Sequence, residues 1–392
     1  MKQPLWTKDF ILFIGSNLFV SLNFYMLVTT MALYSIEQFQ ASESEAGLAS
    51  SIFIIGALLA RILAGGFVEK IGRKRMLYVG LILFAVSTFF YFFAGHLLLL
   101  FAIRFIHGIA FGLSATAMNT TVMDSLPMDR RGEGTGYYSL SSTAATAFGP
   151  FLGILILSKY DMNTIFIYAF CMTIVAFILS FMANVKEAPL TTEERKAIPI
   201  SFKPSILFSF EVLPIASLTM LMGICYASLM SFINIYAIEI NLEEAATYFF
   251  LIYGAFLFIS RPIAGKILDQ KGENIVILPS IVMFAISLFL LSTASNSFMF
   301  LLAAIFAALG FGTYLSVAQV VSAKVAPRHK IGLAVSTFYI GLDTGVGLGP
   351  FLLGFLIPLT GYEHMYLYLS ILVLCLTVFY YFIHGRKAKN YK

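Results

Sequence analysis

One segment of this chain occurs twice and decides its fold. Residues 61–72 read RILAGGFVEKIG, and residues 261–272, at a shift of 200, read RPIAGKILDQKG. Three more matches fall at the same shift: Phe111-Gly112 with Phe311-Gly312, Pro127 with Pro327, and Gly149-Pro150-Phe151-Leu152 with Gly349-Pro350-Phe351-Leu352. Four separate matches at one offset predict an internal duplication that spans most of the chain.

The composition around this repeat excludes a water-soluble globule. The 392 residues are 59% hydrophobic and only 11% charged, whereas soluble proteins carry about 25% charged residues. Three cysteines without a CxxC or Cys/His cluster exclude a disulfide scaffold and indicate no metal site. The net charge of +5 comes from short cationic clusters between apolar runs, which is typical of membrane topology and not of nucleic-acid binding. We expect no cofactor.

Apolar runs predict an all-α membrane protein. A bilayer-spanning helix needs about 20 mostly apolar residues, and about 12 such runs are present. They lie near 10–33, 46–66, 76–94, 97–123, 134–158, 162–184, 211–236, 246–265, 275–294, 297–323, 331–357 and 364–384. With the repeat, these runs predict a six-helix bundle over 1–184, a cytoplasmic linker over 185–208 and a second, pseudo-symmetric six-helix bundle over 209–392.

Lysine and arginine predict the orientation. Alternate loops hold Lys2/Lys8, Lys70/Arg73/Lys74/Arg75, Arg130/Arg131, Lys186/Arg195/Lys196/Lys203, Lys266/Lys271, Lys324/Arg328/Lys330 and Arg386/Lys387/Lys389/Lys392. The opposite loops hold Lys159 alone. This asymmetry predicts that both termini are cytoplasmic. We expect the lipid bilayer to be that of a cell membrane, bacterial by its polytopic organisation.

Two parallel six-helix halves describe one architecture of secondary transporters, with the substrate site between the halves near the midplane. A membrane-embedded enzyme would need a catalytic cluster, and the chain has no HExxH or GxSxG motif. The sequence therefore predicts a transporter and not an enzyme. A membrane receptor is a weaker alternative. A receptor would require neither the internal repeat nor an acidic residue within a span, so it would leave both features unexplained.

The chain resembles the major facilitator superfamily over its whole length. Residues 65–75, GGFVEKIGRKR, are similar to that family's signature loop between its second and third helices, with Glu69 in place of the usual Asp. The resemblance implies a cytoplasmic gate in which acids and cations of neighbouring loops pair; the alternative is that these cations only anchor the topology. Its members would be Gly65, Glu69, Gly72, Arg73, Asp124, Arg130, Arg131 and Asp269.

Asp343 is the most informative single residue. It lies about 12 residues into the eleventh run, which at ~1.5 Å per residue is ~18 Å deep. An ionised carboxylate at the bilayer centre costs at least ~2.5–3.5 kcal/mol, and intramembrane acids are functional by default. Asp343 is therefore predicted to carry a proton or to neutralise a cationic substrate. The alternative is an Asp that only fixes helix packing.

Arg104 and His107 lie one turn apart in the fourth run. An Arg followed by a Gly on this helix resembles a signature that the family links to proton coupling, and Gly108 follows here. Arg is permanently charged and needs an acceptor, while His titrates near physiological pH. Both are predicted to take part in proton coupling; the alternatives are structural anchoring for Arg104 and a hydrogen-bonded core position for His107.

A Gly-Pro motif occurs in the fifth run and again in the eleventh. Its residues are Gly149, Pro150, Gly345, Gly349 and Pro350. Small residues let helices pack closely, and Pro bends them. The first copy resembles the motif that marks bacterial drug or metabolite:proton antiporters, although Ala145 and Ile154 replace glycines of that motif.

Polar and aromatic side chains within the runs are candidates for the wall of a substrate cavity, because polar amides avoid lipid. They are Asn17, Asn23, Tyr25, Asn119, Tyr226, Asn234, Tyr236, Tyr253 and Gln319. Aromatic residues would suit amphipathic or cationic compounds, although Phe and Tyr are so abundant here that any one of them can serve packing alone. The first run contains Asn23 where an acid would be expected in many drug exporters of the family.

The leading hypothesis is a monomeric, proton-coupled exporter of a small organic molecule, either a drug-like amphipathic compound or a metabolite. Its partners would be the substrate, protons and the bilayer. Uptake symport of a small metabolite is the first alternative, since Asp343 alone would permit it. Segments 124–140 and around Asp343 also resemble bacterial metallophore exporters, so export of a metallophore is a further alternative.

Overall fold

The computed structural model describes residues 5–126, 131–185, 187, 208–326, 331–386 and 388, with some side chains inside helices left out. The described residues form helices without any strand, as the apolar runs predict. The helices are α1 (Lys8–Phe39), α2 (Glu43–Ile71), α3 (Arg73–Phe90), η1 (Tyr91–Phe93), α4 (Leu97–Ser125), α5 (Arg131–Leu157), α6 (Met162–Met182), α9 (Leu213–Glu239), α10 (Glu243–Lys271), α11 (Asn274–Ser292), α12 (Ser297–Ala307), η3 (Ala308–Gly312), α13 (Thr313–Val325) and α14 (Ile331–Ile383).

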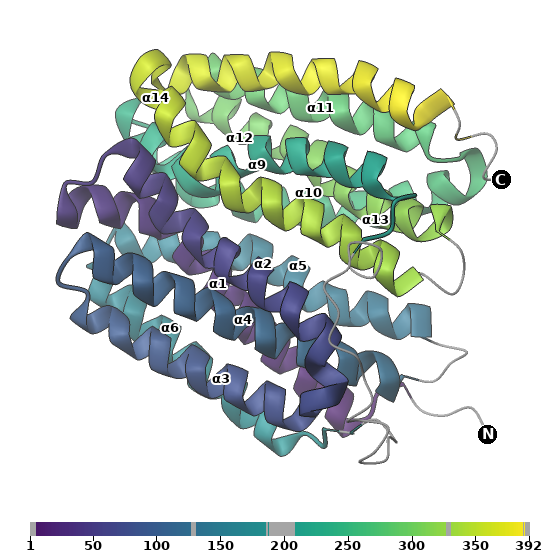
Figure 1. Ribbon diagram of the computed structural model, residues 1–392. Coiled ribbons are helices and arrows are strands. Elements are labelled where there is room, and N and C mark those ends of the chain that lie inside the picture. The colour runs from purple at the N-terminus through teal and green to yellow at the C-terminus, as the bar shows by residue number, and fades with distance from the viewer. Residues whose placement is uncertain are drawn as a thin grey trace. The chain divides into compact units, whose positions relative to one another are not determined.

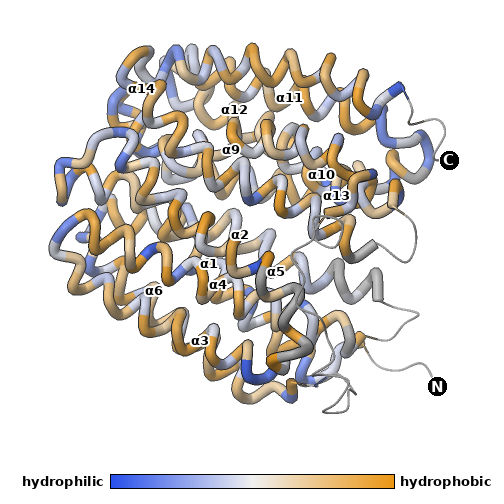
Figure 2. Tube along the Cα trace, in the orientation of Figure 1, coloured by the Kyte–Doolittle hydropathy of each residue, from blue (hydrophilic) through white to orange (hydrophobic). Residues whose placement is uncertain are grey.

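Eleven helices within the described residues are long and apolar enough to cross a membrane. Figure 2 shows hydrophobic residues along α3 and α11 and hydrophilic residues where the chain turns. Helix α14 contains two of the expected spans, and the backbone leaves helical geometry at Gly361, where φ is 72°. Counted as two, its segments confirm the expected number of about 12 spans.

Backbone contacts divide the chain into two compact units. Unit 1 contains 1–28 and 52–201, and unit 2 contains 29–51 and 202–392. The second unit thus takes in the end of α1 and the beginning of α2. Figure 1 shows the long helices of each unit.

The sequence repeat is also a repeat of local structure. His96 caps α4 by accepting a hydrogen bond from the Leu99 amide at 3.2 Å, and Asn296 caps α12 in the same way from Met299 at 3.0 Å. Gly72 and Gly272 both have positive φ, 99° and 87°. Only glycine adopts such values at little cost, which explains why the repeated motif ends in this residue.

Glycines set the distance between α14 and α9. A Cβ atom on Gly341 would lie 2.5 Å from the Ala216 carbonyl oxygen, and one on Gly345 would meet the carbonyl group of Met220. On Gly349 it would lie 2.7 Å from Ala227 Cβ. These three residues are four apart and so share one helix face. The richer copy of the Gly-Pro motif is therefore a close helix–helix contact within unit 2.

We expect Gly345→Ala to lower the thermal unfolding midpoint of the purified protein by several degrees. The added methyl group forces α14 away from the α9 backbone, and overpacking of this kind costs about 1–3 kcal/mol. Gly265→Ala is the matched control, because nothing lies within 4 Å of a Cβ atom there. That variant should gain up to ~1 kcal/mol from helix propensity. Equal midpoints for the two variants would contradict this packing argument.

Candidate functional site

The beginning of α3 is held by an acid from far along the chain. Glu187, which follows α6, accepts hydrogen bonds from the backbone amides of Arg73 at 3.0 Å and Lys74 at 3.1 Å. A carboxylate at this position pairs two amides that a helix start leaves unsatisfied and opposes the positive end of the helix. Arg73 itself is buried. Glu187 therefore connects the signature loop to the end of the sixth span.

The side chains of most other predicted gate residues lie outside the described part of the structure. The structure describes Gly72 and Arg73. The two hydrogen bonds of Glu187 come from backbone amides and involve none of the acids predicted for the gate. The residues whose side chains are not described are Gly65, Glu69, Asp124, Arg130, Arg131 and Asp269. The gate thus stays a prediction.

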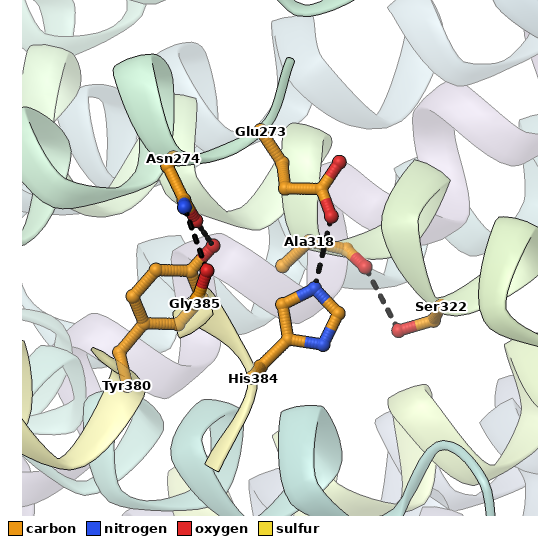
Figure 3. A network of polar contacts seen from close by, with 7 residues as sticks. All are labelled: Glu273, Asn274, Ala318, Ser322, Tyr380, His384 and Gly385. Atoms are coloured by element: carbon orange, nitrogen blue, oxygen red, sulfur yellow. Dashed lines mark hydrogen bonds and ion pairs between the residues drawn. The ribbon is translucent and has the colours of Figure 1, made fainter. Parts of the chain in front are cut away.

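The second copy of this loop makes the equivalent connection with different chemistry. His384, which follows α14, contacts Glu273 through Nε2 and Oε1 at 3.0 Å (Figure 3). Asn274 donates to the Gly385 carbonyl at 2.8 Å and accepts from the Tyr380 hydroxyl at 2.7 Å. In both copies, the start of the third helix is therefore bonded to the chain just beyond the sixth.

We expect the Glu273 contact to make thermal stability depend on acid pH. The His384 hydrogen bond holds the pKa of the Glu273 carboxyl below its ordinary value, against the opposing effect of burial. A lowered pKa stabilises the folded state above the unfolded-state pKa of about 4.3, and this contribution is lost as the pH falls through the folded-state pKa. The unfolding midpoint of wild type should therefore fall more steeply below about pH 4.3 than that of Glu273→Gln.

Glu244 provides the control for this measurement, because its side chain is exposed at the first turn of α10. Glu244→Gln should follow the wild-type pH curve. Parallel curves for wild type and Glu273→Gln would show that the contact with His384 adds nothing to stability.

His107 is the centre of a buried polar network in unit 1. Its Nδ1 lies 2.9 Å from the Tyr91 hydroxyl and its Nε2 lies 3.1 Å from Thr88 Oγ1. The Thr88 hydroxyl donates its hydrogen to the Phe84 carbonyl at 2.8 Å, so it accepts from His107. It follows that Nε2 carries a hydrogen. The Nδ1 atom accepts from the Tyr91 hydroxyl where the imidazole is neutral and donates to it where the ring is protonated.

A neighbouring group of polar contacts joins α1 to α6, and its Thr173 Oγ1 lies 3.5 Å from Thr88 Oγ1. Thr173 donates to the Ala169 carbonyl at 2.9 Å, and the Asn23 amide nitrogen donates to Thr173 Oγ1 at 3.0 Å and to the Ala169 carbonyl at 2.9 Å. Asn23 Oδ1 is buried and has no hydrogen-bond partner among the described residues. Asn23 thus connects α1 to α6 through its amide nitrogen. Its Oδ1 atom accepts no hydrogen bond from the described residues.

Arg104 lies beside this network with a side chain that is 0% exposed. Its guanidinium stands over the Phe53 ring, 4.9 Å from the centroid, and hydrogen-bonds the Tyr91 hydroxyl. A permanently charged group inside a membrane span is expensive and requires compensation. Arg104 and His107 lie one turn apart on α4, and both contact Tyr91 of η1. The three residues therefore form one connected polar group.

The second half packs the same positions without any polar group. At the shift of 200 residues, the positions of Thr88, Tyr91, Arg104, His107 and Thr173 are occupied by Leu288, Leu291, Ala304, Ala307 and Val373. The latter five residues are all buried. The repeated helix arrangement thus does not require this network. The positive charge of Arg104 in unit 1 therefore calls for a reason other than helix packing.

Asp343 shows the opposite asymmetry. It lies in α14, half-buried, and the matching residue of the first half is Thr143 in α5. Two residues correspond to about 200° around a helix, so Asp343 lies on the other side of α14 from Gly341 and Gly345, which contact α9. Unit 1 therefore has Arg104 and His107, and unit 2 has Asp343, at positions within spans where the matching residue of the other unit is neutral.

The candidate cavity residues have different environments. Asn17 donates to Ser141 at 2.7 Å and to Ser142 at 2.9 Å, joining α1 to α5. Asn119 is exposed and Gln319 is half-buried. Asn234 is buried.

The tyrosines among these candidates are mainly packed. Tyr236 is buried and donates to the Leu291 carbonyl at 2.7 Å. Tyr25 lies against Gly149, where an added Cβ atom would come within 2.6 Å of Tyr25 Cβ. Tyr226 and Tyr253 do come together, with ring centroids 6.1 Å apart.

The family assignment follows from a match to the family model. Residues 13–279 and 271–392 match the model of the Major Facilitator Superfamily. The chain belongs to this superfamily. It is accordingly a transporter and not an enzyme, and its all-helical, roughly 12-span fold is that of the family.

Individual relatives of the superfamily are distant. The staphylopine export protein of Staphylococcus aureus is 22% identical over 86% of this chain and 87% of its own. The multidrug resistance protein MdtG of Dickeya zeae is 30% identical over 42% of each chain. The solved structure of a POT family transporter in complex with 5-aminolevulinic acid has a TM-score of 0.80 at 15% identity, over 98% of this chain and 96% of that one. This last likeness shows the major facilitator fold alone.

Sequence reasoning missed a pair of matching aromatic clusters in this transporter. In unit 1, Phe24, Phe53 and Phe111 have centroids 5.2–5.5 Å apart, and Phe84 lies 6.4 Å from Phe111. In unit 2, the Tyr226 ring stacks on Phe311 at 4.1 Å, Tyr253 lies beside Tyr226, and Phe284 lies 5.5 Å from Phe311. The shift of 200 residues relates 53, 84 and 111 to 253, 284 and 311, and this was the signal that could have identified the clusters.

Proposed function

We propose that this chain is a proton-coupled exporter of a small organic molecule, located in the cell membrane with both termini in the cytoplasm. One observation carries the proposal. Arg104 and Asp343 are ionisable residues within membrane spans at positions where the other half has Ala304 and Thr143. Because the repeat packs without charge at these positions, the cost of each charge is best explained by transport.

In this proposal Asp343 carries the proton. Its side chain is half-buried and lies on the face of α14 that points away from α9, so it is not enclosed by the tight glycine contact. A carboxylate inside a span is stabilised by taking up a proton or by pairing with a cation. Protonation from one side of the membrane would therefore be linked to release of a substrate bound near Asp343.

Arg104 and His107 have a supporting role in the proposed coupling. The Tyr91 hydroxyl accepts from Arg104 and lies 2.9 Å from His107 Nδ1, so His107 fixes the position of the group that holds the guanidinium. We propose that Arg104 sets the electrostatic potential of unit 1 and that His107 orients it through Tyr91. The predicted loop gate would close the cytoplasmic end during each cycle.

The direction of transport is inferred from two sources. The Gly149-Pro150 motif, which packs α5 against Tyr25 and Met26 of α1, resembles the motif of proton antiporters. The names of two relatives, a staphylopine exporter and a multidrug resistance protein, also point to export. Both sources favour export over uptake symport.

The test is a flux measurement with purified protein in liposomes that contain a pH-sensitive dye. Tetraphenylphosphonium and ethidium are the first probes, followed by uncharged drugs, under an imposed proton gradient. Antiport predicts that an added probe evokes proton movement opposite to its own. Proton movement in the same direction as the probe would contradict export and indicate uptake symport. Probe flux without proton movement would refute proton coupling.

A metabolite is the second candidate cargo. The specific observation is the extent of similarity: the staphylopine export protein aligns with 86% of this chain, whereas the multidrug relative aligns with 42%. Staphylopine itself, added to the same liposomes, tests this candidate. Flux of staphylopine without flux of the lipophilic cations would assign the cargo to the metabolite class.

A further inference from the structure

The chain before the first helix is packed onto the start of the fifth span. Leu5 is buried, and a Cβ atom on Gly134, near the beginning of α5, would lie 2.9 Å from Leu5 Cδ1. The ring centroid of Trp6, the next residue, lies 4.8 Å from that of Tyr137 in α5 and 5.7 Å from that of Phe10 in α1. Two helices of unit 1 therefore hold Trp6 in a defined place.

Trp6 and Tyr137 lie at the ends of their spans and keep part of each ring exposed. The span in α5 begins at Tyr137, and Trp6 comes just before the span in α1, which begins at Lys8. The side chains of Trp6 and Tyr137 are 53% and 37% exposed. Trp and Tyr are enriched at this level of a bilayer, because an apolar ring with a polar end suits the headgroup region. The exposed surface of the pair therefore faces the environment that such rings prefer.

The polar ends of both rings are available to a ligand. Within the part of the chain that the structure describes, neither the Trp6 indole N–H nor the Tyr137 hydroxyl group forms a hydrogen bond. Lys8 adds an exposed ammonium group at the start of α1, and the neighbouring Asp9 accepts a hydrogen bond from the Asn184 amide at 3.0 Å. Two neutral donors and a cation match the phosphate and ester oxygens of a phospholipid.

The second half attaches the equivalent segment without an aromatic pair. At the shift of 200 residues, Thr337 takes the place of Tyr137, and Thr337 is buried. The chain before α9 is bonded there by the Ser209 amide, which donates to Thr337 Oγ1 at 2.8 Å. Attachment of this segment therefore requires neither exposed rings nor free donors, so a ligand is the better explanation for those of unit 1.

We propose that Trp6, Tyr137 and Lys8 bind an anionic phospholipid at this end of unit 1. The indole N–H and the phenol hydroxyl donate to its phosphate or ester oxygens, and Lys8 pairs with the headgroup charge. An anionic lipid is favoured because cations beside a span attract anionic headgroups and the loops at this end of the chain are the cationic ones. The bound lipid holds the N-terminal segment on the start of α5. The proposal requires only that the chain spans a bilayer and does not rest on export or proton coupling.

The sequence contains its own reporter for this site. Trp6 is the single tryptophan of the chain, so the indole fluorescence of the purified protein comes from this place alone. Phosphatidylglycerol with brominated acyl chains, which quench indole on contact, is to be titrated into the protein in detergent. A binding site predicts quenching that saturates and that unbrominated phosphatidylglycerol reverses. Quenching that rises without saturation, or no quenching, would overturn the site, because the ring would then contact lipid only by chance.

Tyr137→Phe keeps the ring and removes one donor. It is expected to raise the half-saturating concentration of phosphatidylglycerol about two- to tenfold, as loss of one hydrogen bond implies. Tyr160→Phe is the matched control, because Tyr160 is an exposed tyrosine just beyond the other end of α5, and it should leave that concentration unchanged. Equal values for Tyr137→Phe, Tyr160→Phe and wild type would contradict the proposal, whatever the flux measurements show.

The role of charge is tested with brominated phosphatidylcholine, which has no net charge. Wild type should bind phosphatidylglycerol more tightly than phosphatidylcholine, and Lys8→Gln should bring the two half-saturating concentrations close together. Lys159→Gln is the control, because Lys159 is an exposed lysine of the loop after α5, and it should preserve the wild-type difference. Equal binding of the two lipids by wild type would overturn the assignment to an anionic lipid.

Discussion

Asp343→Asn is expected to abolish substrate-driven proton movement in liposomes while leaving the protein folded. Asparagine has nearly the same shape as aspartate but exchanges no proton, so only the charge change is removed. The side chain is half-buried and is not part of the glycine contact with α9, so the thermal unfolding midpoint should stay close to that of wild type. Substrate exchange without net proton movement should persist, because it does not require the proton to leave.

Two further variants make this result specific. Asp343→Glu keeps a titratable carboxylate and should retain part of the coupled flux. Thr143→Val changes the matching position of the first half, and should keep proton coupling. Wild-type proton movement in Asp343→Asn would show that the residue serves packing alone and would remove the proposed mechanism.

Arg104→Ala is expected to reduce coupled transport at least about tenfold, the effect of losing a hydrogen bond from a charged group. It should nevertheless give folded protein, because the second half packs alanine, Ala304, at the matching position. The comparison of flux with the unfolding midpoint separates a role in transport from a role in stability.

Arg104→Lys distinguishes charge from geometry. Lysine keeps the positive charge but lacks the planar fork of donors, so a purely electrostatic role predicts that flux is largely retained. Loss of flux in both variants would assign the effect to the guanidinium bond with Tyr91. A lowered unfolding midpoint with unchanged flux per folded molecule would make Arg104 a structural anchor.

The fold was predictable because membrane spans obey a single strong constraint. Backbone groups in lipid must be satisfied within a helix, so the apolar runs alone gave the spans to within a few residues. The structure shows the same repeat in the caps at His96 and Asn296 and in the positive φ of Gly72 and Gly272. The break at Gly361 was expected only as a short loop, because a positive φ leaves no mark in hydropathy.

The partners of the buried residues were less predictable. Glu187 lies 114 residues beyond the loop it caps, in a segment that looked like a plain linker. The network around His107 joins α3, η1 and α4, and periodicity within one helix cannot show which hydroxyl group of another faces it. Comparing the two halves position by position would have shown more than motifs did, because Ala304 and Leu291 mark the neutral version of the same packing.

The Tyr362 hydroxyl of α14 donates a hydrogen bond to Glu43 Oε2 at the start of α2, at 2.7 Å, and this contact has a consequence for the synthesis of the protein. Its two residues are 319 positions apart, and ribosomes add about 5–20 residues per second. The first helix pair therefore waits on the order of 15–60 s for its partner to be synthesised. During biogenesis, the earliest part of the chain to enter the membrane is among the last to complete its packing.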